Sequence, residues 1–178
     1  MAVAVITSEP LRVEDLLGEA PAPSDGARVV FVGVVRDHAE GRPVRGMRYE
    51  GYEPMAAEVL RAIVEEAEER HDVGAVSALH RLGELEIGEA SVAILVSGPH
   101  RDDAYRASRY VIEEIKRRLP VWKHEHFADG SARWVPGTPL GSQAGAPLAA
   151  GDATLSADGP PATREAPGPA TREVPGGG

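Results

Sequence analysis

The chain has 178 residues, of which 42% are hydrophobic and 26% charged, as is usual for a globular protein with one substantial core. Its formal net charge of -9 argues against a general nucleic-acid binder or a binder of anionic membranes, because both partners favour a basic surface. The absence of cysteine excludes disulfides, thiolate nucleophiles and thiolate metal sites. With no basic leader and no run of membrane-spanning length, we expect a cytoplasmic protein.

Three strands and a short helix are predicted in the first part of the chain. Residues 2–7 predict a strand, and residues 8–17 predict a brief helix. Residues 27–36 form a nearly continuous β-branched and apolar run, typical of a strand that is buried on both faces. Residues 44–52 alternate between apolar and polar side chains, so we expect this strand to pair back as a hairpin.

A long helix and two strands follow. Pro54 starts a helical pattern that continues to Ala67, with one apolar stripe and an opposite acidic face that we expect to be only solvated. Residues 73–82 and 91–97 predict two strands separated by a turn-rich segment. The second of these strands leads directly into another helical pattern.

That second helix and a hairpin complete the predicted fold. Residues 102–118 have apolar and small side chains at helical spacing, with Asp102 as the expected N-cap and Pro120 as the stop. Residues 121–127 and 131–135 predict two strands joined by an Asp-Gly turn. Because strands and helices mix without strict alternation, the sequence predicts an α+β domain.

The composition changes completely at Pro136. More than half of the residues from there onward are Gly, Pro or Ala, and one octapeptide occurs twice in nearly the same form. Such a segment buries too little apolar surface to offset its conformational entropy. The sequence therefore predicts a folded domain at residues 1–136 and a disordered tail at residues 137–178.

Lys116 and Lys123 are the only lysines in a chain that otherwise uses arginine wherever it needs a positive charge. A guanidinium stays protonated in proteins, whereas an ammonium can lose its proton and serve as base, acid or nucleophile. Lys116 falls in the last helical turn, at the edge of the apolar face, and Lys123 shares one side of an extended segment with Glu125. The alternative is a helix-terminal cation and a solvated strand residue, but the pair favours a site.

Three further basic residues lie where predicted strands end. Arg36 follows the apolar strand, and His100 and Arg101 precede a helix N-terminus, where backbone N–H groups favour an anion. Together with the lysines they would form a cationic pocket for a phosphate or a carboxylate. The alternatives are a salt bridge between Arg36 and Asp37 and a capping or packed role for His100.

The other histidine motifs favour structural roles. His80 and Arg81 lie inside a strand pattern, where we expect packing. His124 and His126 share one face of a strand, but no further ligand has the spacing of a metal motif, so we expect no metal site. The chain also lacks a phosphate-binding glycine loop, a nucleophile elbow and a dinucleotide fingerprint, and we expect no cofactor.

Three segments together resemble a known family. They are FVGVVRDHAEGRPVRGMRYEGYEPMA, HRLGELEIGEASVAILVSGPHRDDAYRAS and IKRRLPVWKHE, in this order and spacing. Over residues 1–136 the chain is similar to the large, catalytic subunit of molybdopterin synthase. The resemblance implies an α/β-hammerhead-like fold with a mixed or antiparallel sheet. It also implies a homodimer that binds two small ubiquitin-like sulfur-carrier subunits, forming a heterotetramer.

The resemblance also implies a sulfurtransferase reaction. The carrier would insert its C-terminal Gly-Gly thiocarboxylate into the pocket. Its sulfur would be transferred to cyclic pyranopterin monophosphate, once for each sulfur of the molybdopterin dithiolene, with opening of the cyclic phosphate. This is a step of molybdenum cofactor biosynthesis.

Roles for individual residues follow from the same resemblance. Lys116 and Lys123 would be the catalytic amines, and Arg36, His100 and Arg101 would hold the phosphate and the pterin. At the position after the second lysine the chain has a histidine where the family commonly has a second basic Lys or Arg. The other residues implied to line the substrate site are Val34, Val35, His124 and Glu125.

Two other functions remain compatible with the residues alone. One is an enzyme that forms a Schiff base between a lysine and a phosphorylated carbonyl substrate. The other is a non-catalytic anion-binding adaptor domain that uses its tail as an interaction arm. A borohydride-trapped imine would support the first, and unchanged function without both lysines would support the second.

Overall fold

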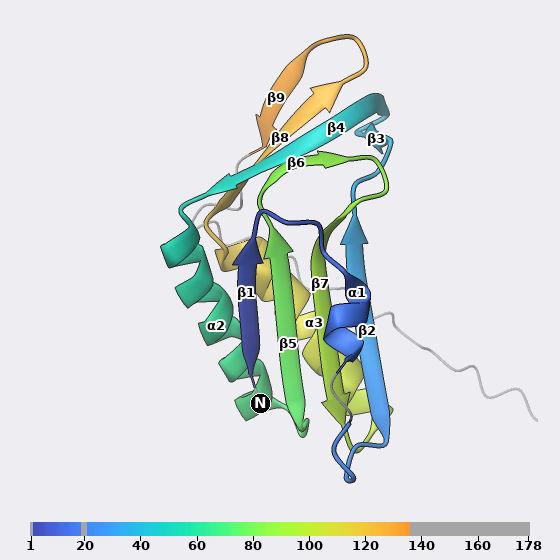
Figure 1. Cartoon of the computed structure of the whole chain (residues 1–178), viewed down its shortest axis with the longest axis vertical. Coiled ribbons are helices and arrows are strands. Elements are labelled where there is room, and N and C mark those ends of the chain that lie inside the picture. The colour runs from blue at the N-terminus through green and yellow to red at the C-terminus, as the bar shows by residue number, and fades with distance from the viewer. Residues whose placement is uncertain (1, 19–20, 136–178) are drawn as a thin grey trace, which may run out of the picture. The chain divides into compact units, whose positions relative to one another are not determined.

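The computed structural model of the chain describes residues 2–18 and 21–135 (Figure 1). The tail predicted at residues 137–178 lies outside the described residues, so its disorder and the domain boundary at residue 136 stay predictions. The described residues form two sheets and three helices. The α+β class predicted from the sequence is therefore confirmed.

The first sheet has four strands and is mixed. Two neighbouring strands at one edge of the sheet pair in parallel, and the remaining pairs of neighbours are antiparallel. The long helices α2 (Glu53–Arg70) and α3 (Arg101–Arg118) pack on one face, while the short helix α1 (Val13–Leu17) packs on the other (Figure 1). The strands in spatial order are β1 (Val3–Thr7), β5 (Ala75–Arg81), β7 (Ala90–Gly98) and β2 (Ala27–Val34).

The strand that is buried on both faces is β7 and not β2, so this part of the sequence prediction is wrong. β7 lies between β5 and β2, and its alternate side chains face the long helices on one side and Leu16 of α1 on the other. β2 is an edge strand in which Val30 is 37% and Val34 51% exposed. An apolar run shows that a strand is hydrophobic, but its place in the sheet decides which faces are covered.

The two long helices follow the periodicity of the sequence. α2 begins beside Pro54 and buries its predicted stripe against the sheet and α3. Its acidic face is not merely solvated, which corrects the prediction. Glu66 pairs with Arg118 of α3, and Glu68 accepts a hydrogen bond of 3.0 Å from the backbone N–H of Val76.

Helix α3 begins two residues earlier than the predicted cap at Asp102 places it. Its N-cap is His100, without a side-chain capping hydrogen bond, and Asp102 lies in the first turn. There a carboxylate interacts favourably with the helix dipole, so the acidic residue still suits this end of the helix. The helix ends at Arg118, just before Leu119 and Pro120, as predicted. Lys116 is therefore in the final turn.

The second sheet lies beyond one end of the first (Figure 1). We predicted that the strand at residues 44–52 pairs back on the apolar strand before it, and this is wrong. It forms a tight hairpin with β3 through a turn in which Glu40 and Gly41 have positive φ, and then pairs with β8 and β6. The strands are β3 (His38–Ala39), β4 (Arg42–Gly51), β6 (Gly83–Glu86), β8 (Val121–Phe127) and β9 (Ala132–Val135).

This sheet differs from the prediction at β6 and agrees with it at β8 and β9. β6 forms inside the segment predicted to be turns, because its backbone pairs with β4 and not because of any pattern of its own. β8 and β9 match the predicted hairpin. No helix in the described part of the chain is long and apolar enough to cross a membrane.

Candidate active site

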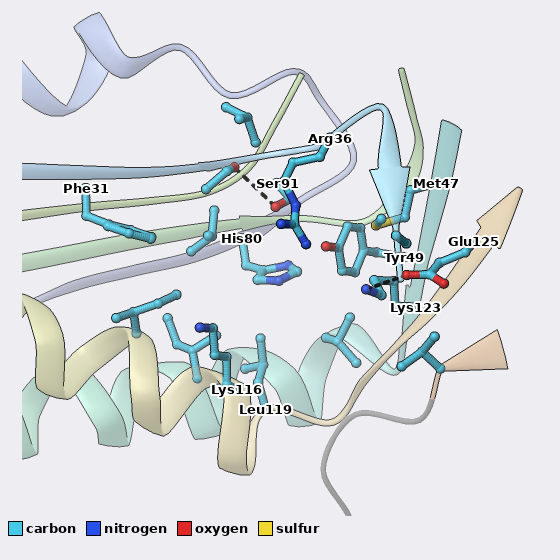
Figure 2. A pocket seen from close by; sticks show the side chains of 18 of the residues that line it. Phe31, Arg36, Met47, Tyr49, His80, Ser91, Lys116, Leu119, Lys123 and Glu125 are labelled. Atoms are coloured by element: carbon cyan, nitrogen blue, oxygen red, sulfur yellow. Dashed lines mark hydrogen bonds and ion pairs between the residues drawn. The ribbon is translucent and has the colours of Figure 1, made fainter. Parts of the chain in front are cut away.

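A cavity of about 540 Å³ opens between the first sheet, the last turn of α3 and the second sheet (Figure 2). Its apolar walls come from β2, β7 and α3. Its polar groups come from five segments that are far apart in the sequence, so only the tertiary fold brings them together. The polar lining residues are Arg36, His38, Tyr49, His80, Ser91, Lys116, Lys123 and Glu125.

Lys116 enters the cavity from the C-terminal turn of α3. Ile112 and Ile115, which precede it on the helix, line the same wall, and this is the edge of the apolar face that the sequence predicts. Lys116 forms no ion pair with any residue that the structure describes. Its neighbours Arg117 and Arg118 do, with Glu114 at 2.5 Å and 3.3 Å. The Lys116 amine is thus available to a ligand.

Lys123 reaches the same cavity from β8, but an ion pair holds its amine in place. Its Nζ lies 2.8 Å from Oε1 of Glu125, whose side chain is only 2% exposed. Arg133 binds the other oxygen of that carboxylate at 3.0 Å. Burial by itself would raise the pKa of Glu125, but the hydrogen bonds from Lys123 and Arg133 outweigh it, and the pKa is lowered. The carboxylate therefore stays ionised and fixes the position of the Lys123 amine.

Arg36 lies two residues beyond the end of β2 and lines the cavity. The salt bridge considered between Arg36 and Asp37 does not form, because Asp37 instead accepts a contact of 2.6 Å from His38. Among the described residues Arg36 has no carboxylate partner. Like Lys116, it is a cation with free hydrogen-bonding capacity facing the cavity.

The two valines before Arg36 differ in whether they line the cavity. Val34 lines the cavity with an exposed side chain. Val35 is 3% exposed and packs with Met47 and Leu85, and its backbone N–H and C=O are already bonded to the segment after β6 at 3.0 Å and 2.8 Å. Val35 therefore supports the wall and has no free backbone group to offer a ligand.

The structure does not bring His100 and Arg101 to this cavity in one chain. They lie at the opposite end of α3 from Lys116, about 22 Å away along the helix axis. The Arg101 side chain is 83% exposed, and its only ion pair with a described residue is a loose one of 3.8 Å to Asp102. His124 is also outside the cavity. It lies on the other side of β8 from the lysine, with its ring stacked on Trp134 at a centroid distance of 4.3 Å.

His80 lines the cavity, although its strand position led us to favour a packing role. Arg81 does have the structural role expected, because it binds Glu89 at 2.9 Å and the carbonyl of Glu84 at 3.2 Å. A signal for His80 was present in the sequence. Val76 and Ala78 precede it at alternate positions and are fully buried, so a titratable side chain continues an apolar core face.

Nothing in the described part of the chain forms a metal centre, since no group of three or more His, Asp or Glu side chains converges there. His124 and His126 lie edge to face at a centroid distance of 4.7 Å. The cavity thus offers amines, a guanidinium, an imidazole and a fixed carboxylate. Such a set can bind an anion, transfer protons and stabilise developing negative charge.

Comparison with known proteins connects this geometry to a family. The family model described as MoaE protein matches residues 6–118. Molybdopterin synthase catalytic subunit 1 of Mycobacterium tuberculosis (strain ATCC 25618 / H37Rv) is 41% identical over 134 residues, which cover 75% of this chain and 90% of that protein. The molybdopterin synthase catalytic subunit of Bacillus subtilis (strain 168) is 41% identical over 130 residues, covering 73% and 82%.

Solved structures agree. Molybdopterin synthase from Staphylococcus aureus superimposes with a TM-score of 0.70 at 39% identity, covering 74% of this chain and 96% of that one. The complex of subunits 1 and 2 of the molybdopterin-converting factor from Helicobacter pylori 26695 shares the fold, with a TM-score of 0.57 at 24% identity. The family-model match includes Lys116 and the cavity-lining residues before it, whereas Lys123 and Glu125 lie beyond residue 118. The chain belongs to the MoaE family of molybdopterin synthase catalytic subunits.

Proposed function

We propose that this protein is a sulfurtransferase that moves sulfur from the C-terminal thiocarboxylate of a small ubiquitin-like carrier subunit to cyclic pyranopterin monophosphate. The observation that carries the proposal is the unpaired Lys116 amine in a cavity that also holds Arg36, in a chain of this family. The volume of about 540 Å³ lies within the usual range for a small-molecule site. The products are the molybdopterin dithiolene and the carrier with a C-terminal carboxylate.

Lys116 acts on the carrier. Its amine has no carboxylate partner, so it is free to meet the carbonyl of the incoming thiocarboxylate and to stabilise the negative charge that develops on the oxygen. The helix packs tightly up to Ile115, which fixes the point from which the Lys116 side chain extends into the cavity. The minimal role of Lys116 is charge stabilisation with proton transfer.

Lys123 acts on the substrate. Glu125 holds its amine at 2.8 Å and keeps it in one place, which suits a group that must meet a defined atom. Arg36 binds the phosphate, because its guanidinium donates to none of the described residues and has a planar geometry that matches phosphate oxygens. Glu125 contributes by positioning the Lys123 amine, and Val34 forms part of the apolar wall of the cavity.

His100 and Arg101 belong to the same site only if another copy of the chain supplies them. In one chain they lie about 22 Å from Lys116 along α3, farther than a small ligand spans. A homodimer, in which the N-terminal end of α3 from one copy borders the cavity of the other, removes this difficulty. The dimer with two carriers is the heterotetramer that the family implies, and a cytoplasmic location is part of the same proposal.

The test is a reconstitution with purified components. The protein is incubated with thiocarboxylated carrier and cyclic pyranopterin monophosphate, and the dithiolene product is followed by mass. The matched control is Arg117→Ala, which removes a cation from the same helical turn but from the solvent side, where it pairs with Glu114. Wild type and Arg117→Ala should both form product, and Lys116→Ala should not. A wild type that consumes no thiocarboxylate would overturn the proposal.

The Schiff-base alternative is tested in the same mixture. Lys116 is an unpaired amine close to Arg36, so it has the surroundings that an imine-forming lysine needs. Borohydride is added to the protein with the pterin substrate alone. A mass increase on Lys116 would favour that chemistry, and no increase, together with dithiolene formation, would favour sulfur transfer without an imine.

A further inference from the structure

His80 is a buried polar side chain that neither the packing nor the roles above explain. It lies on β5 between β1 and β7, and its side chain is within the cavity (Figure 2). In that view its ring lies between the Arg36 guanidinium and the Lys116 side chain. The residue is 6% exposed, and one ring edge meets the ring of Tyr49 at a centroid distance of 5.3 Å.

The Nδ1 atom of His80 has no hydrogen-bond partner among the residues that the structure describes. Buried polar atoms are nearly always satisfied in native proteins, because an unsatisfied one loses its bonds to water and gains nothing in return. A leucine at this position would fill the space without leaving such an atom. Nδ1 itself has less than 1 Å² of accessible surface, so a ligand in the cavity can reach the imidazole only through Nε2, which also forms no hydrogen bond with the described residues.

The imidazole is electrically neutral. Burial lowers its pKa to about 4, and a backbone contact at Arg81 opposes this only weakly. The charged groups of the same cavity are Arg36, Lys116, Lys123 and Glu125, of which only the last favours a protonated ring, and it is already bound to Lys123. A neutral imidazole offers one donor and one acceptor. It therefore suits an uncharged polar group, whereas the cations suit a phosphate.

We propose that His80 is a substrate-binding residue whose Nε2 forms a hydrogen bond with the uncharged polar edge of the pterin heterocycle, while the cations of the cavity bind the phosphate. This inference rests on the proposed function and adds to it a group that recognises the ring. His80 thereby distinguishes a heterocyclic phosphate from an open-chain phosphate of similar charge.

The experiment compares three substitutions in the full chain with its carrier. His80→Leu removes the polar atoms, His80→Asn places a polar atom near the position of Nδ1, and His80→Gln places one near Nε2. The control is His71→Leu, because His71 also has a buried ring nitrogen without a partner but lies at the end of α2, outside the cavity. Product formation is measured in single turnover against pterin concentration, with saturating thiocarboxylated carrier.

We expect His80→Leu to raise the half-saturating pterin concentration about tenfold, as the loss of one buried hydrogen bond does, with carrier affinity and melting temperature unchanged. His80→Gln should stay closer to wild type than His80→Asn, and His71→Leu should match wild type. An unchanged pterin dependence in His80→Leu, or a melting temperature that falls without any binding effect, would show a packing histidine. If His80→Leu does not fold, a His80→Asn protein that binds better than His80→Gln overturns the assignment of Nε2.

Direct binding separates this inference from the proposed function. Equilibrium binding of the pterin substrate without carrier is followed by calorimetric titration. A wild type that turns over, with His80→Leu binding equally well, overturns only the role of His80. A wild type that neither binds the pterin nor forms product overturns both.

Discussion

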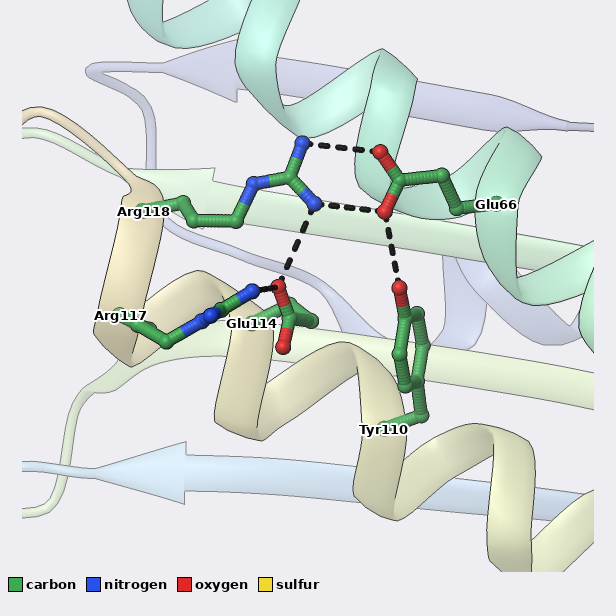
Figure 3. A network of polar contacts seen from close by, with 5 residues as sticks. All are labelled: Glu66, Tyr110, Glu114, Arg117 and Arg118. Atoms are coloured by element: carbon green, nitrogen blue, oxygen red, sulfur yellow. Dashed lines mark hydrogen bonds and ion pairs between the residues drawn. The ribbon is translucent and has the colours of Figure 1, made fainter. Parts of the chain in front are cut away.

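The last turn of α3 carries positively charged side chains on two sides, and the charge has a different role on each side. On one side Lys116 faces the cavity without an ion pair to any described residue. On the other side Arg118 binds both carboxylate oxygens of Glu66 on α2, one of them at 2.9 Å, and also Glu114 at 3.3 Å (Figure 3). Tyr110 donates a further hydrogen bond of 2.8 Å to Glu66.

The difference lies in whether a carboxylate already satisfies the cation. The hydrogen bonds from Arg118 and then Tyr110 lower the pKa of Glu66 to about 2, so the carboxylate is ionised and the pair is complete. A cation in such a network joins two helices and has little left for a ligand. Lys116 is only two residues away and has no carboxylate partner within residues 2–18 and 21–135. The paired side thus holds the turn in place, and the unpaired side is available for chemistry.

The largest effect should come from Lys116→Arg. Arginine keeps the charge and much of the stem but cannot lose its proton at any working pH, and its fork is wider than an ammonium. We expect the single-turnover rate to fall about a hundredfold or more, nearly as far as in Lys116→Ala, with carrier binding and melting temperature retained. Arg117→Lys, on the paired side of the turn, is the control and should be active. Activity of Lys116→Arg within a few-fold of wild type would remove the distinction between the two sides.

Lys123→Arg should have a smaller effect. Lys123 is also in the cavity, but Glu125 holds its amine, so part of what it does is to keep a fixed charge in place, and arginine preserves that part. We expect a rate loss of about tenfold in the same assay. Glu125→Gln should cause a comparable loss if the carboxylate positions the amine. Equal losses for Lys116→Arg and Lys123→Arg would show that pairing does not separate the two lysines.

The paired side should govern stability. Replacing Glu66 by Gln should lower the free energy of unfolding at pH 7 by about 1–3 kcal/mol, with the lower half favoured because both side chains are partly exposed. The measurement is urea denaturation at several pH values. Turnover well below the melting temperature should stay close to wild type. Glu65→Gln, an exposed glutamate one residue earlier on α2, should leave stability unchanged.

The difference in the free energy of unfolding between wild type and Glu66→Gln should change with pH in one direction. The pKa of Glu66 is depressed in the folded protein, to about 2 from an ordinary 4.5. Its contribution is therefore fully present above about pH 4.5 and is lost as the pH falls toward 2. The stability gap between wild type and Glu66→Gln should close over that interval. A gap that stays constant from neutral to acid pH would mean that the ionised carboxylate is not what stabilises the pair.

Local features of the chain were predictable from the sequence. Helical spacing located α3 and put Lys116 in its last turn, and alternation put Lys123 and Glu125 on the same side of β8. The scarcity of lysine then singled out two amines that line one cavity. Each of these inferences needs only residues that are near one another in the sequence.

Long-range features were not predictable in this way. The edge position of β2 depends on where β7 pairs, and the partner of Arg118 is 52 residues away on another helix. His80 was assigned to packing because its strand is regular, and only the assembled cavity shows that its ring faces the lysines. The separation of His100 and Arg101 from the cavity follows from the length of α3. Pairing and burial are properties of the assembled chain, which local patterns do not specify.

The smallest effect should come from removing residues 137–178. If both sides of the α3 turn account for function and stability, nothing that follows the second sheet should be required. The match to the family model ends at residue 118, and the lining residues of the cavity that the structure describes all lie at or before Val135. We expect the shortened chain to unfold at the same temperature and to form dithiolene at a rate within about twofold of the full chain. Carrier affinity should also be unchanged, measured by titration of labelled carrier into each form. A shortened chain that folds normally but no longer binds the carrier would locate part of the interaction in the tail, and the adaptor reading with an interaction arm would then gain support over a site confined to the folded domain.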